Sequence, residues 1–345
     1  MSKMSAEIGE QPAVLSQCLE QNAAMLGKIR AAINSRQIDS VCIAARGTSD
    51  HAAVYGKYLF ELTMEIPVTL AASSVFTIYG KNLKLDHTLV IGISQSGKAA
   101  DVLEVVRAAK RQGALTVSIT NFPESPLATA AQFHLACAAG PEQSVAATKT
   151  FTTELFLLGN LAAEWSQDPA LRAELAAIPR GIAKTLTAEP LIVAKAERYR
   201  FMEECFVLAR GVNYAVSLEA ALKIQETTYV RAKAFATSDF QHGPIAMLNP
   251  AIPVIIFAPD GPSLNDLASM TQRLKQEGLE LIIVSNNQSL LQLANAAFPI
   301  PPTANDLISP FYNAVIAQLF ACQLAAVKDL DPDHPRSLNK VTITK

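Results

Sequence analysis

The chain has 345 residues, of which half are hydrophobic and 17% are charged. This composition supplies ample apolar material for packed cores and excludes intrinsic disorder, which needs low hydrophobicity and a high net charge. The 29 basic and 31 acidic residues leave a net charge of −2, which argues against nucleic acid as a partner. At about 150 residues per domain, the length predicts two domains.

The sequence gives no sign of a membrane segment or a secretion signal. The longest apolar runs, such as residues 253–259, fall far short of the roughly 20 residues that a spanning helix needs. The first 20 residues carry three glutamates and no apolar stretch of the signal-peptide kind. The five cysteines are scattered, mostly within apolar segments, and none has zinc-ligand spacing. We therefore expect a cytoplasmic protein with buried free thiols and no metal or other cofactor.

Short apolar runs alternate with helical patterns along the chain. Continuous apolar runs indicate strands that are covered on both faces, and hence parallel sheets with helices on each side. The predicted strands lie near residues 40–46, 67–71, 88–93, 115–119, 133–137, 205–209, 253–257 and 280–284. The predicted helices lie near residues 49–63, 99–112, 147–164, 214–230, 264–277 and 309–328.

The second half of the chain repeats the first. Arg46-Gly47 and Arg210-Gly211 stand 164 positions apart, and the run 89–93 leading to Gly97 matches 253–257 leading to Gly261 at the same offset. A constant offset indicates duplication of one domain. The predicted fold class is α/β, with two tandem three-layer αβα domains. Its parts are a leading helical segment 1–36, a first domain 37–167, a helical connector 168–194, a second domain 195–328 and a tail 329–345.

Two loops after predicted strands are rich in hydroxyl groups. One is Ser94-Gln95-Ser96-Gly97-Lys98, and the other is Gly47-Thr48-Ser49. Ligands of doubly wound sheets bind beyond the carboxyl ends of the strands. One such loop alone is better explained as a helix cap, but the pair favours a phosphate site. The matching loop of the second repeat, Ala258-Pro259-Asp260-Gly261, has no hydroxyl group, so we expect one phosphate site per chain.

Three charged residues share one face of the predicted helix 214–230. Glu219, Lys223 and Glu226 are spaced four and three positions apart, a pattern that also builds ordinary surface ion pairs. The rest of this helix is apolar, which indicates burial or a cleft, where a carboxylate can serve as a general base. By position alone, His242 and Lys340 are better explained as surface residues.

Together these motifs resemble tandem sugar-isomerase (SIS) domains, and the whole pattern looks like the isomerase half of glucosamine-6-phosphate synthase. The resemblance runs from about residue 40 to the end of the chain and rests on six motifs in the family's order. They are Arg46–Ala52, Ser94–Gly97, Val145–Thr152, Leu218–Glu226, His242–Pro244 and Pro335–Thr342.

The resemblance implies a catalytic set. Glu226 would move the proton between C1 and C2 of the open-chain sugar, with Lys223 in support. His242 would open the sugar ring from the neighbouring subunit, which implies a homodimer. Lys340 would be the Schiff-base lysine, in a tail that Arg336 helps to hold over the pocket. The implied phosphosugar-binding residues are Arg46, Thr48, Ser49, Ser94, Gln95, Ser96, Gly97, Lys98, Val145, Ala147 and Asn339.

The chain departs from the synthase pattern at several of these positions. Arg46 stands where the synthase has cysteine, Lys98-Ala99 where it has Glu-Thr, and Ala147 where it has a serine that contacts the sugar. The sugar contacts therefore transfer least securely, and Arg46 and Lys98 offer charge in place of the lost hydroxyl groups.

We expect a glucosamine-6-phosphate deaminase, which converts its substrate and water to fructose 6-phosphate and ammonia. The sequence shows no glutaminase segment or nucleophilic N-terminal cysteine to supply ammonia, so deamination is favoured over synthesis. A galactosamine-6-phosphate deaminase or a fructosamine-6-phosphate deglycase is the nearest enzymatic alternative. A non-catalytic phosphosugar sensor is the alternative of another class.

Overall fold

The computed structural model describes residues 2–340 and consists of two compact units, each built around one sheet. The β1–β5 unit contains residues 13–142, 149–176 and 339–340, whereas the β6–β10 unit contains residues 2–12, 143–148 and 177–338. Each unit is described by itself below. Val341 and Thr342 of the predicted tail motif lie outside the described residues.

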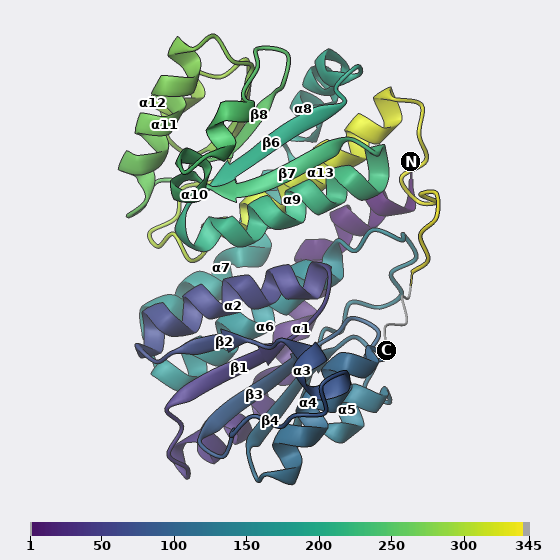
Figure 1. Cartoon of the computed structure of the whole chain (residues 1–345), viewed down its shortest axis with the longest axis vertical. Helices are drawn as coiled ribbons and strands as arrows, with labels where there is room; N and C mark the ends of the chain where they lie inside the picture. Colours follow the sequence, from purple (N-terminus) through teal and green to yellow (C-terminus); the bar gives the residue numbers. More distant parts are fainter. Residues whose placement is uncertain (1, 341–345) are drawn as a thin grey trace. The chain divides into compact units, whose positions relative to one another are not determined.

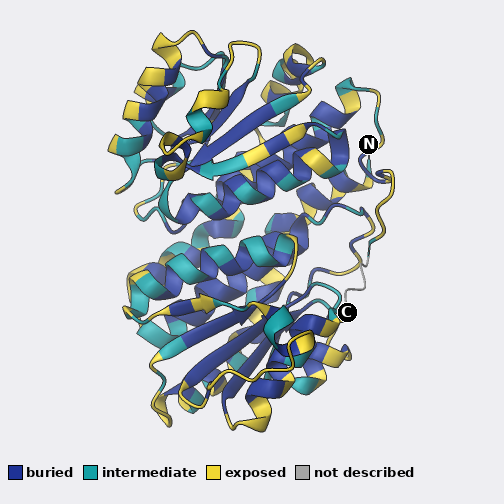
Figure 2. Cartoon of the chain, viewed as in Figure 1, coloured by how far each residue is buried: buried dark blue, intermediate teal, exposed yellow. Residues whose placement is uncertain are grey.

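The β1–β5 unit holds a five-stranded sheet in the order β2-β1-β3-β4-β5, and every pair is parallel (Figure 1). Its strands are β1 (Ser40–Ala44), β2 (Val68–Leu70), β3 (Thr88–Ile93), β4 (Leu115–Thr120) and β5 (Phe133–Ala136). All residues of β3 and β4 are buried, as continuous apolar sequence predicts for central parallel strands (Figure 2).

Helices cover both faces of this sheet. They are α1 (Lys3–Asn34), whose residues 3–12 belong to the β6–β10 unit, α2 (Thr48–Met64), α3 (Ser73–Thr77), α4 (Ala100–Arg111), α5 (Pro126–Ala130) and α6 (Lys149–Ser166). A Cβ on Gly56 of α2 would lie 3.0 Å from Ile43 of β1 and 3.2 Å from Leu158 of α6, so these helices share one face. Alternate strand residues, such as Val90, pack with α3, α4 and α5 on the other face.

The β6–β10 unit repeats this topology, with the order β7-β6-β8-β9-β10 and parallel pairing throughout. Its strands are β6 (Glu204–Ala209), β7 (Arg231–Ala236), β8 (Val254–Phe257), β9 (Leu281–Ser285) and β10 (Ala296–Pro299). Each strand corresponds to the strand at the same place in the first sheet. The identical order supports the duplication that the sequence indicates.

Helices again lie on both sides of the sheet. Those of this unit are α8 (Glu189–Ala196), α9 (Tyr214–Thr228), α10 (Thr237–Gln241), α11 (Leu264–Gln276), α12 (Gln288–Leu291) and α13 (Ser309–Val327), with short 3₁₀ turns at Glu197–Tyr199, Gly211–Asn213 and Pro244–Met247. Helix α7 (Pro169–Leu186) contributes residues to both units. Helices α10, α11 and α12 pack on one face around Ile256, whereas α9 and α13 pack on the other around Ile255.

The predicted α/β class with parallel sheets is confirmed, and each predicted strand and helix has a counterpart. Strands β7 and β10 were not predicted. Strand β7 alternates exposed and buried residues at the sheet edge, with Arg231 and Lys233 exposed, so it lacks the continuous apolar run of a central strand. Strand β10 has only four residues and ends at Pro299, which suits a sheet edge.

Helix α13 bears on the expectation that the chain has no membrane segment. By length and hydropathy it is the one helix among the described residues that could span a membrane. However, 83% of its most apolar window is buried inside the protein. Its apolar character is therefore explained by its place in the core, where it packs against α9 and β10.

The five cysteines are free and buried, as predicted. Burial raises the pKa of the Cys42 thiol to about 11 and that of Cys205 to about 12. Because the thiolate is the reactive form, these cysteines are structural.

Candidate functional site

The strand order reverses direction between β1 and β3, which makes this place the topological switch point of the first sheet. Loops that follow two such strands run to opposite sides of the sheet and leave an open crevice at its carboxyl edge. The loop after β1 contains Arg46, Thr48 and Ser49, and the loop after β3 is Ser94–Lys98. Both predicted hydroxyl-rich loops therefore lie at the edge where ligands of this topology bind.

The Ser94–Lys98 loop is a tight turn fixed by backbone hydrogen bonds. The Gly97 amide donates to Ser94 O at 3.0 Å, and Gln95 O accepts from the Asn121 amide at 3.0 Å. Gly97 has φ +63°, and a Cβ there would lie 2.0 Å from Ser125 Oγ and 2.4 Å from Ser125 Cβ. The glycine is therefore required by backbone conformation and by the close approach of Ser125.

This turn has the form of an anion cradle. Ser94 is buried, Gln95 and Ser96 are half-buried, and Lys98 is exposed. The Ser96 hydroxyl accepts from the Lys98 amide at 3.3 Å, and the chain then enters α4. Consecutive amides in such a turn, followed by a helix N-terminus, attract a negatively charged group.

The loop after β1 is tied to the loop after β3 by an ion pair. Arg46 Nε donates to Asp101 Oδ2 at 2.6 Å, and Asp101 is buried in the first turn of α4. The Ser49 hydroxyl donates to Glu154 Oε1 of α6 at 2.8 Å, so its proton is directed into the core. Thr48 lies half-buried at the start of α2. Burial raises the pKa of the neighbouring Asp50 carboxyl, although His51 and Arg46 oppose the rise.

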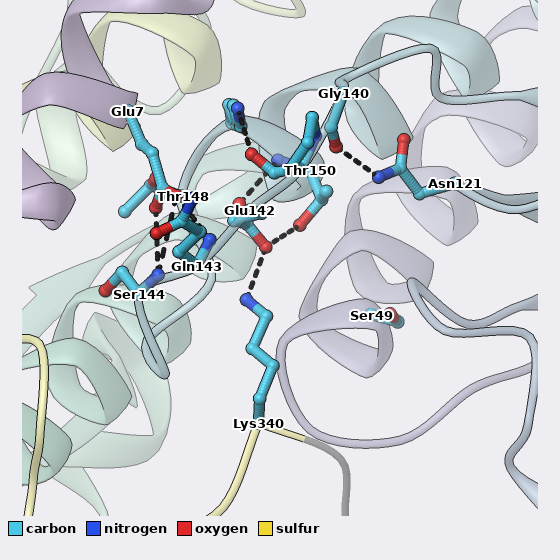
Figure 3. Close-up of polar contacts among 12 residues, drawn as sticks. Glu7, Ser49, Asn121, Gly140, Glu142, Gln143, Ser144, Thr148, Thr150 and Lys340 are labelled. Carbon is cyan, nitrogen blue, oxygen red and sulfur yellow. Dashed lines mark hydrogen bonds and ion pairs between the residues drawn. The ribbon is translucent and has the colours of Figure 1, made fainter.

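Lys340 is held by a buried carboxylate that sequence reasoning missed. Its Nζ lies 2.7 Å from Glu142 Oε2, and the Glu142 side chain is completely buried (Figure 3). Thr150, in the first turn of α6, donates its amide to Glu142 Oε1 at 3.1 Å and its hydroxyl to Oε2 at 2.8 Å. Asn339 is exposed next to this pair. No periodic pattern marks Glu142, although it lies only three residues before the Val145–Thr152 motif.

The predicted sugar-binding segment around Val145 and Ala147 belongs to the β6–β10 unit. Its start is held by Glu7 of α1, whose carboxylate accepts from the amides of Gln143 and Ser144 (Figure 3). At its end, Gln318 Nε2 of α13 donates to Thr148 O at 3.1 Å. Val145 and Ala147 are half-buried between these fixed points.

Helix α9 carries the predicted Glu219, Lys223 and Glu226 as one cluster. Lys223 Nζ lies 2.5 Å from Glu226 Oε2 and 3.4 Å from Glu219 Oε1. Lys223 and Glu219 are fully buried, whereas 21% of the Glu226 side chain is exposed. Burial acts to lower the pKa of Lys223, but the two carboxylates outweigh it and raise that pKa to about 12. Lys223 is therefore a fixed cation, and Glu226 is the member of the cluster that solvent reaches.

His242 and Arg336 lie elsewhere in the β6–β10 unit. His242 is exposed at the end of α10, next to Gly243 with φ 135°. Arg336 stacks on the Tyr229 ring, with its guanidinium carbon 4.0 Å from the ring centroid, and its amide donates to the Tyr229 hydroxyl at 2.9 Å. The tail is thus fixed to the end of α9, four residues before Lys340.

The corresponding edge of the second sheet has different chemistry. The Asp260 amide donates to Asn286 Oδ1 at 2.7 Å, and Asn287 Nδ2 donates to Asp260 Oδ1 at 2.9 Å. This loop offers a carboxylate where the first repeat offers hydroxyl groups. Among residues 2–340, no group of three or more His, Cys, Asp or Glu side chains is arranged to hold a metal ion.

The predicted residues are divided between the two units. The β1–β5 unit holds Arg46, Thr48, Ser49, Ser94, Gln95, Ser96, Gly97, Lys98, Asn339 and Lys340. The β6–β10 unit holds Val145, Ala147, Lys223, Glu226 and His242.

Comparisons with known proteins agree with this architecture. The model of the SIS domain family matches residues 36–163 and 202–328. The glutamine–fructose-6-phosphate aminotransferase (isomerizing) of Methanothermobacter thermautotrophicus is 34% identical over 339 residues, covering 98% of this chain and 56% of that protein. The chain thus spans little more than half the length of the curated relatives it matches.

Solved structures extend the similarity. A Silicibacter pomeroyi protein, provisionally described as a phosphosugar isomerase, has a TM-score of 0.87 and 32% identity, covering 96% of this chain and 100% of that one. The C-terminal domain of the Francisella tularensis glucosamine-fructose-6-phosphate aminotransferase has a TM-score of 0.86 and 25% identity, with 97% and 98% covered. The Thermotoga maritima glucosamine-6-phosphate deaminase shares the fold, with a TM-score of 0.77 and 22% identity over 99% and 100% of the chains.

Substituting Gly97 by alanine tests the close approach of Gly97 to Ser125 in the Ser94–Lys98 loop, which we call the anion loop. Gly97→Ala should lower the free energy of unfolding by about 2–4 kcal/mol, because a methyl group collides with Ser125 and the left-handed conformation is lost. Gly113→Ala is the matched control, since Gly113 also has positive φ but open space around it, and should cost about 1 kcal/mol. Urea unfolding measures both, and equal losses would contradict the account.

Substituting Lys223 by methionine tests the buried cluster. Lys223→Met leaves two carboxylates without their cation and should lower the free energy of unfolding by about 3–5 kcal/mol at neutral pH. The deficit should shrink as the pH falls, because protonation neutralises the carboxylates left behind. In the unsubstituted protein the stabilisation from the raised pKa of Lys223 is fully present below its ordinary value of 10.5 and is lost as the pH rises through about 12.

The matched control for this test is Lys57→Met, which removes an exposed pair with Glu61 at the same four-residue spacing. It should cost about 0.5 kcal/mol or less. Urea denaturation across a range of pH measures both variants. A pH-independent loss, or one as small as that of the control, would show that the cluster is not electrostatically coupled.

Proposed function

The chain is a tandem member of the SIS domain family, and on that premise we propose that it is a phosphosugar enzyme that deaminates glucosamine 6-phosphate to fructose 6-phosphate and ammonia. One observation carries the proposal most: Glu226, partly open to solvent, is ion-paired to a lysine that is itself fully buried. A carboxylate that is held in place by a buried cation and is open to solvent on one side suits repeated proton transfer between adjacent carbons. Membership of the SIS domain family and the Ser94–Gly97 loop support a phosphosugar as the substrate.

The phosphate would bind at the Ser94–Gly97 loop. The amides of Gln95 and Ser96 and the hydroxyl groups of Ser94, Ser96 and Thr48 would donate to the phosphate oxygens, while the Gln95 and Lys98 side chains would line the approach. Arg46, which is ion-paired with Asp101, would lie beside the phosphate. Ser49 would position α2 through Glu154. The half-buried Val145 and Ala147, with the exposed Asn339, would contact the sugar.

The reaction then follows from the chemistry of the open-chain sugar. His242 of the partner subunit would protonate the ring oxygen and open the ring, giving an aldehyde at C1. Glu226 removes the C2 proton and returns it to C1, which converts the aminoaldehyde into a C2 imine. The Lys340 amine displaces ammonia from this imine, and water hydrolyses the resulting Schiff base to release fructose 6-phosphate. One water is consumed and one ammonia is released.

The role of His242 makes a homodimer part of the proposal. His242 is exposed in its own chain, as a residue donated to a partner must be. We also propose a cytoplasmic location, in keeping with a phosphorylated metabolite as substrate.

An ammonia assay tests the reaction. The purified protein incubated with glucosamine 6-phosphate should release ammonia and fructose 6-phosphate in equal amounts. Glu226→Gln should lower kcat by about 10²–10⁴ and leave KM within a few-fold, because it removes the proton acceptor but not the phosphate contacts. Release from galactosamine 6-phosphate or a fructosamine 6-phosphate instead would identify those alternatives. Tight binding without turnover would identify a sensor and contradict the proposal.

Mixing two inactive variants tests the dimer. His242→Ala and Glu226→Gln should each be inactive alone, because each removes one group from every site. If His242 acts across the interface, a mixed dimer contains one intact site, so random mixing by co-expression should restore about a quarter of the unsubstituted activity. No recovery, with mixed dimers confirmed by mass spectrometry, would place both groups in one chain.

A further inference from the structure

We propose that Glu142 is the positioning residue for the Lys340 amine, and that Thr150 orients Glu142 for this task. This inference deepens the proposed function, on which it rests, by assigning the group that holds the lysine and accepts its proton. All three residues belong to the β1–β5 unit. Glu142 lies outside every motif of the sequence analysis, and Thr150 lies within the Val145–Thr152 motif but has no role assigned there.

The geometry of Glu142 is that of a fixed anchor. Its side chain is completely buried, and Thr150 supplies two of its hydrogen bonds, one from the amide and one from the hydroxyl. Thr150 lies in the first turn of the 18-residue helix α6, where the helix dipole favours a negative charge. On the other side, the buried Lys149 donates its Nζ to Pro141 O at 2.7 Å, which fixes the backbone just before Glu142.

The chain that leads to Lys340 is exposed, in contrast to the buried surroundings of Glu142. Residues 336–339 are exposed, and the chain here has no helix or strand among the residues described. Among residues 2–340, Glu142 is the one carboxylate paired with the Lys340 ammonium. A lysine on an exposed tail has many rotamers, so the bond of 2.7 Å to a rigid carboxylate removes most of its freedom.

The Lys340–Glu142 pair also provides a route by which Lys340 can lose a proton. An ammonium ion is not a nucleophile, so Lys340 must lose a proton before its nitrogen can attack C2. Glu142 Oε2, 2.7 Å from this nitrogen, can take the proton as the nitrogen attacks C2, so that formation of the bond to C2 offsets the loss of the ion pair. The proton returns when ammonia or water leaves the substrate carbon, so the step is balanced without any further reactant. Orientation and proton acceptance both predict slower Schiff-base formation when Glu142 is changed.

Reductive trapping tests this assignment directly. The protein is incubated with fructose 6-phosphate and sodium cyanoborohydride, and the adduct on Lys340 is followed by peptide mass spectrometry. Glu142→Gln keeps the shape of the side chain and should slow adduct formation by about tenfold to a hundredfold. The dissociation constant for fructose 6-phosphate, measured by calorimetry, should stay within about twofold, because the phosphate contacts are unchanged. A merely structural role would weaken binding and trapping together.

Thr150→Val provides a second variant that keeps the charged pair and removes one hydrogen bond to Glu142. Trapping should slow by about threefold to tenfold. Thr152→Val is its matched control, because the buried Thr152 hydroxyl donates to Lys149 O within the helix and not to Glu142. This control should trap at the unsubstituted rate. Thr150→Val decides the question if Glu142→Gln does not fold.

The outcomes separate this inference from the proposed function. An adduct on Lys340 that forms equally fast in Glu142→Gln and the unsubstituted protein overturns the role of Glu142 alone. The same holds if Thr150→Val matches Thr152→Val. Absence of any adduct on Lys340 in the unsubstituted protein overturns the lysine step of the proposed function, and this inference with it.

Discussion

The constraint on which this structure depends is the burial of parallel strands on both faces. Such strands need helical crossovers, and the crossovers from β1 to β2 and from β3 to β4 leave the sheet in opposite directions. The two loops at this reversal run to opposite faces of the sheet, which is where ligands of this topology bind. The position of the anion loop is thus a consequence of strand order, and its chemistry is a consequence of Ser94, Ser96 and Gly97.

Duplication explains both the symmetry of the chain and its division of labour. The two sheets have the same strand order, and Arg46–Asp101 and Arg210–Asp266 are ion pairs at equivalent places. The first repeat keeps a hydroxyl-rich turn, whereas the second has Asp260 bound by two asparagines. The second repeat instead carries the acid–base cluster of α9. In the proposed reaction, the first copy binds the phosphate and the second copy supplies the proton acceptor.

The central strands and the charged face of α9 were predictable from the sequence, for physical reasons. Central strands such as β3 and β8 show continuous apolar runs, and α9 shows its charged face by helical spacing. Strand β7 was missed because an edge strand with exposed Arg231 and Lys233 follows a different pattern. Glu142 and Asp101 were missed because their partners, Lys340 and Arg46, are 198 and 55 positions away, and only the fold brings them together. The hydrogen bond from the Ser49 hydroxyl to Glu154 could not be predicted from the sequence for the same reason.

The central proposal is that the protein deaminates a phosphosugar, with the phosphate bound by the Ser94–Gly97 turn and the C2 proton taken by Glu226. A crystal structure with bound glucosamine 6-phosphate tests it most directly. The account predicts the phosphate on the amides of the Ser94–Gly97 turn, with C1 and C2 beside the Glu226 carboxylate. A phosphate bound elsewhere, or a sugar whose reacting carbons lie far from Glu226, would contradict it.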